Sequence, residues 1–463
     1  MMKHKYFLLM IFSSLLFTVA AAQNTNAFTV QQAVDYAKKN SIQVRSALID
    51  VELQRQTNKE ITARAYPNIS ASGTLIYFPN EAVQTFPNFI SAATYGVLSQ
   101  EGVKDGNGNT IVAPADFGFV QAQFGTKYNL TAGVDLQQLL FDGQVFVGLQ
   151  ARKATLDFAR KQVEVTEEMI SVNVQKIYYQ LTVARQQMGS IDANIVRFEK
   201  LLADTKEIFK QGFAERLDVD KVNVQLNNIQ TEKIKLQNQI SAGLAGLKFL
   251  MNMPQQDSLL LTDTLSYEMI SDDLLDNNYN AADRKEYQLL QTARKLGQYD
   301  VKRYKVSYLP TLALFGNYSK NEQRNKFDFF QGQYFTASNI GVRLSVPIFE
   351  GFAKKARIDA AQLRLDKINL NMEQLEQNIA ADVKTSIMNM TSALATINQQ
   401  KKNMELAEKV YNTTKFKYEQ GLGSNQEIYS AQAELRVAQN SYYASFYDAV
   451  IARIDYLKAT GKL

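Results

Sequence analysis

The sequence predicts a mainly α-helical fold with a few transmembrane β-strands, built from an internal duplication. Residues 144–210 and 352–419 contain no proline and read as very long helices. GVDLQQLLFDG at 133–143 returns as GVRLSVPIFEG at 341–351, an offset of 208 residues. Four short segments alternate apolar and polar residues. Each half therefore has the order shorter helix, strand, loop, strand, very long helix, glycine turn and returning helix.

Residues 1–22 read as a secretory signal peptide. Lys3 and Lys5 form a positive start, residues 6–19 are largely apolar, and three alanines supply the cleavage site before Gln23. The alternative is a membrane anchor, but the apolar run is shorter than the roughly 18 to 20 residues of a spanning helix. Removing this segment lowers the net charge from +5 to +3. That charge is too small to indicate a nucleic-acid partner.

The composition excludes several chemistries. The only histidine, His4, lies in the signal peptide, and the chain contains no cysteine. Histidine acid-base catalysis, cysteine nucleophiles, disulfides, soft metal sites and lipid attachment through an N-terminal cysteine are therefore excluded. Carboxylate-only enzymes such as glycosidases remain compatible with this composition. We expect no catalytic residues, no metal and no cofactor.

The second long helix carries a coiled-coil pattern. Its apolar residues recur at spacings of three and four, with one four-residue stutter near Val383. These positions are Ala361, Leu365, Ile368, Met372, Leu375, Ile379, Val383, Ile387, Met390, Leu394 and Ile397. A helix of this length spans roughly 100 Å at 1.5 Å per residue, so it must belong to an extended coiled-coil body.

The other helices are shorter. The pattern predicts returning helices at 215–252 and 424–459, and a shorter helix before each first strand at 30–64 and 284–306. Thr29 and Gln32 form a capping box at the first start.

Two glycines mark the reversals of the long helices. Gly212 and Gly421 lie 209 residues apart, each just after a long helix. Glycine adopts the left-handed conformation of a helix C-cap without steric cost. Ser424 with Glu427 predicts a capping box, so a new helix begins at once. A purely structural role as helix-ending turns accounts for the local geometry of both glycine segments. It does not explain why these turns lie at the ends of the longest helices.

The alternating segments are 68–77, 129–137 and 339–346, with 311–318 less regular. Their apolar positions are Ile69, Ala71, Leu75 and Tyr77, then Leu130, Ala132, Val134 and Leu136, then Ile340, Val342, Leu344 and Val346. Such alternation fits transmembrane barrel strands of about 9 to 11 residues. A half-buried soluble sheet is the alternative, but the signal peptide and the paired long helices favour the membrane interpretation.

Four strands cannot close a membrane barrel, because the smallest bacterial barrels use eight and an open sheet leaves unpaired backbone in lipid. The sequence therefore predicts a barrel shared between subunits. Residues 79–126 and 321–337 are then the connections between strands, the first one carrying KDGNGNT. Long connections in such barrels face outward from the cell.

The chain resembles the TolC-type outer-membrane efflux proteins, also called outer membrane factors. The resemblance rests on the duplicated halves, the junctions YPNIS and YLPTL, the PIFEG start of a long helix and the tips QGF and QGL. It covers nearly the whole mature chain and implies a homotrimer, with a twelve-stranded β-barrel in the outer membrane and a helical tunnel in the periplasm. The domains expected are the signal peptide at 1–22, a first repeat at 23–252, an equatorial linker at 253–282 and a second repeat at 283–463.

The resemblance also implies partners and a function. The expected role is passive export of drugs or other small molecules when a periplasmic adaptor (a membrane fusion protein) and an inner-membrane pump dock on the tunnel. It implies adaptor docking at Gly212, Phe213, Gly421 and Leu422, although glutamine precedes each glycine where the family has valine.

The family's constricting carboxylates at the periplasmic gate have counterparts here. Asp218 and Glu427 stand six residues after the two glycines, and Asp220 is a further candidate. Acids favoured in a first helical turn by the helix dipole are the alternative reading. Two other functions also stay open, namely type I protein secretion through the same channel and a secreted structural coiled-coil protein without a pore.

Overall fold

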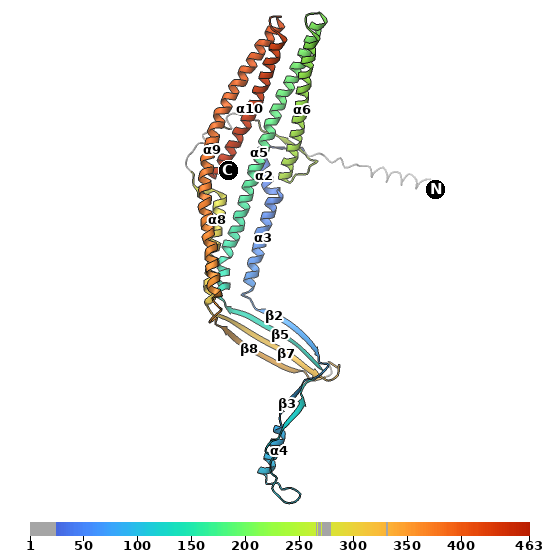
Figure 1. Cartoon of the computed structure of the whole chain (residues 1–463), viewed down its shortest axis with the longest axis vertical. Coiled ribbons are helices and arrows are strands. Elements are labelled where there is room, and N and C mark those ends of the chain that lie inside the picture. Colours follow the sequence, from blue (N-terminus) through green and yellow to red (C-terminus); the bar gives the residue numbers. More distant parts are fainter. Residues whose placement is uncertain (1–24, 265, 267–269, 271–278, 330–331) are drawn as a thin grey trace, which may run out of the picture. The chain divides into compact units, whose positions relative to one another are not determined.

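The structure, a computed structural model, describes residues 25–463 except 265, 267–269, 271–278 and 330–331 (Figure 1). The predicted signal peptide and its cleavage site before Gln23 lie outside the described residues. The chain divides into two units. One comprises residues 1–57, 151–301 and 359–463, and the other comprises 58–150 and 302–358.

The long helices form as the sequence predicts. They are α5 (Gly143–Lys210) and α9 (Ala353–Glu419), and the returning helices are α6 (Arg216–Met251) and α10 (Asn425–Thr460) (Figure 1). Predicted and observed ends differ by at most one residue. All eleven apolar positions of the coiled-coil pattern in α9 are buried or half-buried. The pattern therefore identified the packed face of α9 correctly.

The shorter helices are α8 (Lys285–Lys305), α2 (Val30–Asn40) and α3 (Ile42–Ala63). The capping box of Thr29 and Gln32 is present at the start of α2. The prediction of one helix over 30–64 is wrong at Ser41, which has φ −53° and ψ 134°. The Asn40 carbonyl oxygen there accepts a hydrogen bond from Asn252 Nδ2 at 3.1 Å instead of continuing the helix.

A two-stranded parallel sheet was not predicted. It joins β1 (Thr25–Phe28) to β6 (Ser258–Leu261), which lies inside the predicted linker. Each strand has four residues, too few for alternation to be read from sequence. The domain boundaries given above, including the equatorial linker at 253–282, stay a prediction.

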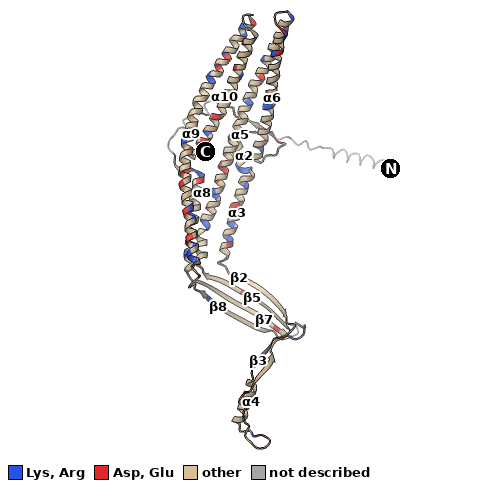
Figure 2. Cartoon of the chain, in the orientation of Figure 1, with Lys and Arg blue, Asp and Glu red and all other residues tan. Residues whose placement is uncertain are grey.

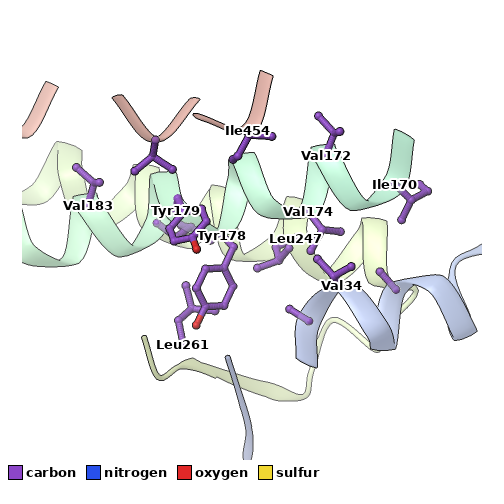
Figure 3. Packing of buried hydrophobic residues seen from close by; sticks show 14 of the residues in the cluster. Val34, Ile170, Val172, Val174, Tyr178, Tyr179, Val183, Leu247, Leu261 and Ile454 are labelled. Carbon is purple, nitrogen blue, oxygen red and sulfur yellow. The ribbon is translucent and has the colours of Figure 1, made fainter. Parts of the chain in front are cut away.

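The largest apolar cluster lies among the helices of the first unit. Figure 3 shows Tyr178 and Tyr179 of α5 among side chains from α2, α6, α10 and β6. The Tyr178 hydroxyl donates a hydrogen bond to the Phe28 carbonyl oxygen at 2.8 Å and accepts one from the Asp263 N–H at 3.2 Å. This buried tyrosine thereby connects the long helix to the small parallel sheet.

The second unit contains a four-stranded antiparallel sheet. Its order is β2 (Asn68–Tyr77), β5 (Tyr128–Phe141), β7 (Thr311–Arg324) and β8 (Phe335–Ser345) (Figure 1). All four predicted strands are present. β7 and β8 both extend into the predicted connection at 321–337, so that connection is shorter than the sequence indicated.

The connection at 79–126 is not a simple loop. It contains β3 (Val83–Pro87), α4 (Phe89–Gln100) and β4 (Phe119–Gln123), and β3 and β4 pair as an antiparallel hairpin. The sequence interpretation missed all three elements.

Candidate functional site

The turn after α5 is a Schellman motif centred on Gly212. Its φ of 80° is left-handed, and its N–H donates to the Phe209 carbonyl oxygen at 3.0 Å. The Phe213 N–H donates to the Ile208 carbonyl oxygen at 3.1 Å. These two bonds satisfy carbonyl groups that the end of a helix leaves open.

The turn after α9 repeats this geometry at Gly421. Its φ is 72°, and its N–H donates to the Tyr418 carbonyl oxygen at 3.0 Å. The Leu422 N–H donates to the Lys417 carbonyl oxygen at 2.9 Å. The two halves of the duplication therefore have the same turn geometry.

Both tips present bare backbone beside an apolar side chain. A Cβ added at Gly212 or Gly421 would meet no atom within 4 Å. Phe213 is 84% exposed and Leu422 is 82% exposed. An apolar side chain this exposed, next to accessible backbone, is the kind of anchor that a partner helix can bind.

The three predicted gate acids lie near the starts of the returning helices, Asp218 and Glu427 in the first turn and Asp220 just beyond it. The Asp218 carboxylate accepts a hydrogen bond from the Glu215 N–H at 3.2 Å, so it caps α6. Asp220 lies 3.9 Å from Arg216 in an exposed ion pair. The Glu427 side chain is exposed. The main-chain N–H of Glu427 donates a hydrogen bond to the Ser424 hydroxyl at 3.3 Å. This geometry is compatible with Asp218 as a cap of α6 and as a residue of the gate.

Tyr429, which the sequence interpretation missed, lies next to these acids. Its hydroxyl donates to the Asp218 carbonyl oxygen at 3.0 Å and joins α10 to the start of α6. Burial and, secondly, the nearby Asp218 charge raise the pKa of Tyr429. The position of Tyr429, two residues after Glu427, was the feature in the sequence that could have indicated it. Its contact with Asp218 joins the two halves of the duplication, and one sequence does not show such contacts.

Buried polar side chains continue between the helices. Asn194 of α5 donates to Gln439 at 3.0 Å and accepts from Gln432 at 3.1 Å, both on α10. Ser190 and Tyr443 share a hydrogen bond of 2.6 Å. Such polar contacts between helices specify one pairing, because any slip leaves buried groups unsatisfied.

The register of the four-stranded sheet sorts its side chains by polarity. Opposed residues share a face, and the pairs Ile69↔Leu136, Ala71↔Val134 and Leu75↔Leu130 place the predicted apolar sets of β2 and β5 together. Leu314↔Val342 and Gly316↔Ile340 continue that face across β7 and β8. The predicted alternation therefore gives a largely apolar face, on which Lys320 and Glu322 of β7 also lie, opposite Ala132 and Leu130.

The opposite face of this sheet is polar. Asn317 donates to the Asp135 carboxylate at 2.9 Å, and Thr131 donates to Asn321 at 2.7 Å. The Arg343 guanidinium lies over the Phe315 ring, 5.2 Å from its centroid. This division fits strands between lipid and an aqueous lumen. Figure 2 shows that charged residues are numerous on the helices and few on these strands.

No helix in the described part of the chain is both long enough and apolar enough to cross a lipid bilayer.

Among the residues that the structure describes, no three acidic or histidine side chains are grouped so that they could hold a metal ion.

Known proteins share both sequence and fold with this chain. A family profile described as "Outer membrane efflux protein" matches residues 282–462. The outer membrane protein TolC of Vibrio cholerae is 20% identical over 341 residues, which is 72% of this chain and 77% of that protein. The alkaline protease secretion protein AprF of Pseudomonas aeruginosa is 21% identical over 327 residues, covering 69% of this chain and 67% of that protein.

Solved structures show the same fold. CusC, in a study of transmembrane channel formation, superimposes with a TM-score of 0.73 at 16% identity, covering 93% of this chain and 92% of that chain. The outer membrane protein VceC of Vibrio cholerae superimposes with a TM-score of 0.67 at 14% identity, covering 93% and 96%.

Fold and sequence together define an outer-membrane channel protein. The chain resembles the TolC-type outer-membrane efflux proteins, in sequence over residues 282–462 and in fold over 93% of its length. It is a protein of the outer membrane that extends into the periplasm, and it is a channel and not an enzyme.

Proposed function

We propose that this chain is the outer-membrane exit duct of a tripartite efflux system. It passively exports drugs or other small molecules when docked to a periplasmic adaptor and an inner-membrane pump. The observation that carries this proposal is the four-stranded sheet, which has one apolar face, one polar face and two edges, β2 and β8.

The sheet favours assembly from several copies. Unpaired edges in lipid cost several kcal/mol per unsatisfied group, so β2 of one copy must pair with β8 of the next. Three copies give the twelve-stranded barrel that the family resemblance implies, with its apolar face in outer-membrane lipid. The homotrimer thereby removes both edges of every sheet.

Apolar residues left exposed on the helices support the same assembly. Ile42 and Ile49 on α3, and Leu363 and Leu370 on α9, are exposed at a seven-residue spacing. A seven-residue apolar repeat is the pattern of a coiled-coil seam. Neighbouring copies would cover these faces and complete a helical tunnel in the periplasm.

The tips are the proposed sites of contact and control. Phe213 and Leu422, beside Gly212 and Gly421, bind the adaptor. Asp218, Asp220 and Glu427 form the periplasmic gate. The bare glycine backbone and the high exposure of both apolar side chains support the docking role.

Type I protein secretion is the second candidate. Its support is the similarity to AprF, whose name describes secretion of an alkaline protease. The channel itself serves either system, and the partner pump decides the cargo. Pull-down of the crosslinked complex therefore separates them, because a drug pump or an ATP-driven protein exporter would be recovered with the adaptor.

Assembly tests the proposal directly. The detergent-extracted protein should have a mass of roughly three times that of one mature chain and should form pores in planar bilayers. A stable monomer that retains its full β content by circular dichroism would contradict the shared barrel.

A further inference from the structure

The segment between β2 and β5 is a folded element with an uncovered apolar helix. The β3–β4 hairpin pairs Val83 with Gln123 and Pro87 with Phe119. Asn88 caps α4 by accepting the Ser91 N–H at 3.0 Å. Aromatic contacts join Phe86 to Phe124 at 5.1 Å and Tyr95 to Phe117 at 5.7 Å. These contacts give α4 a defined position on its hairpin.

The surface of α4 is uncharged, largely apolar and uncovered. None of its residues is buried, and Phe89, Ile90 and Val97 are 61%, 63% and 59% exposed. No charged residue occurs from 82 to 100, and α4 carries no charge colour in Figure 2. A helix without a charged face does not remain in water without a partner.

We propose that α4 packs against the α4 helices of the other copies of this chain, in a contact between subunits outside the membrane. This inference rests on the homotrimer proposed above. The segment leaves the sheet from β2, an edge strand that the trimer pairs with its neighbour. It therefore begins at a subunit boundary.

The charge distribution favours copies of the chain over a lipid surface. Residues 79–126 contain one lysine and four acids, a net charge of −3. A helix that lies on a membrane carries Lys and Arg on a polar face, and an acidic segment is repelled by anionic headgroups. All five charges lie outside residues 82–100, so the surface of α4 itself brings no charge into the contact, although Glu101 follows directly as its C-cap.

The shape of α4 also suits contact between like helices. Ala92 and Gly96 are four residues apart and lie on one side of the helix, where they allow two backbones to approach closely. Phe89, Ala93 and Val97 form an adjacent apolar row at the same spacing. Three identical helices can bury both rows.

Single cysteines test the contact, because the natural chain contains none. Val97→Cys should give disulfide-linked dimers on mild oxidation of the detergent-extracted protein, since a disulfide requires Cβ atoms about 3.5–4.5 Å apart. Asn107→Cys, exposed in the turn outside α4, is the control and should give about tenfold less dimer, because the proposed contact does not include it. Ala93→Cys replaces Val97→Cys if the latter assembles poorly.

The native mass of each variant separates the two proposals. A monomeric native mass would refute the homotrimer itself. A trimer in which neither Val97→Cys nor Ala93→Cys exceeds the control would overturn the α4 contact alone. A fluorophore on Val97→Cys that is quenched by nitroxide lipids in vesicles would place α4 on lipid, and would likewise overturn it.

Discussion

The Tyr429 hydroxyl donates a hydrogen bond to the main-chain oxygen of Asp218 at 3.0 Å, across a separation of 211 residues. It ties the start of α6 to α10 close to both glycine turns. Because burial and the Asp218 charge raise the pKa of this tyrosine, its hydroxyl stays protonated at every physiological pH. The bond is therefore a permanent donor contact and not a pH-dependent one.

Removing this bond should loosen the tips. Tyr429→Phe keeps the ring, loses the hydrogen bond and should cost about 0.5–1.5 kcal/mol of stability. We expect a higher single-channel conductance in planar bilayers, because the helices at the narrow end separate more easily. Tyr443→Phe is the matched control, since it removes the bond to Ser190 on another part of α10. Equal conductance in both variants would contradict a specific role for Tyr429.

The repeated helices and strands could be predicted because their patterns are long. Eleven apolar positions define one face of α9, and alternation over about ten residues defines β2 and β5. The glycine turns were predictable from a single residue, because a left-handed φ at the end of a helix favours glycine strongly.

The rest depends on contacts that no local pattern contains. At the break before Ser41, the Asn40 carbonyl oxygen is bound by Asn252, more than 200 residues away in the sequence. β1 forms only because β6 pairs with it. The residues of the gate and tips were proposed from a family resemblance, and Tyr429 was missed because its partner is a main-chain oxygen.

The two glycine tips should be essential for export and dispensable for assembly. Replacing Gly212 and Gly421 together with leucine should abolish drug export in a strain that lacks its own duct, because bulky side chains cover the docking surface. Trimer yield should change little, since a Cβ at either position meets no atom within 4 Å. Susceptibility to exported drugs and native mass are the two measurements.

Backbone strain needs its own control at these tips. Both glycines have a positive φ, which costs most residues roughly 1–2 kcal/mol. Asparagine accepts this conformation more readily and is smaller than leucine. The double Asn variant should therefore retain most export. Full export by the leucine variant would mean that the adaptor docks elsewhere.

Glu168 of α5 should destabilise the folded protein at neutral pH. It is buried, and burial followed by the nearby Glu286 raises its pKa. Because the pKa of Glu168 is higher in the folded protein than in the unfolded chain, protonation of this carboxyl favours folding. The contribution is fully present below the unfolded-state pKa of about 4.3 and is lost as pH rises. Glu168→Gln should therefore raise the melting temperature at pH 7.5 and lose this advantage near pH 4.

Glu164 provides the comparison for Glu168. It forms ion pairs with Lys161 at 2.7 Å and Lys285 at 3.7 Å, so Glu164→Gln should not stabilise the protein at either pH. Melting curves of both variants in detergent at the two pH values make the test. A stabilised Glu164→Gln would point to a general effect of removing acids.

The acids at the tips decide between a gate and simple capping. In a trimer, Asp218, Asp220 and Glu427 would recur as rings of carboxylates at the tunnel's lower end, and such rings favour cations. Asp218 also caps α6 through the Glu215 N–H, so alanine would remove charge and cap together. Substitution of the aspartates by asparagine and of the glutamate by glutamine removes only the charge.

Amide substitution therefore gives the sharper experiment. The variant with Asp218→Asn, Asp220→Asn and Glu427→Gln keeps an acceptor oxygen for the Glu215 N–H, so its trimer should be as stable as the natural one. If the acids line the opening, its preference for cations should fall, and block by divalent ions added on the periplasmic side should weaken. Bilayer reversal potentials under a salt gradient measure the first effect, and current block measures the second.

The control is Asp116→Asn in the segment before β5, which should change neither. Unchanged selectivity and block in a trimeric amide variant would leave capping as the role of these acids.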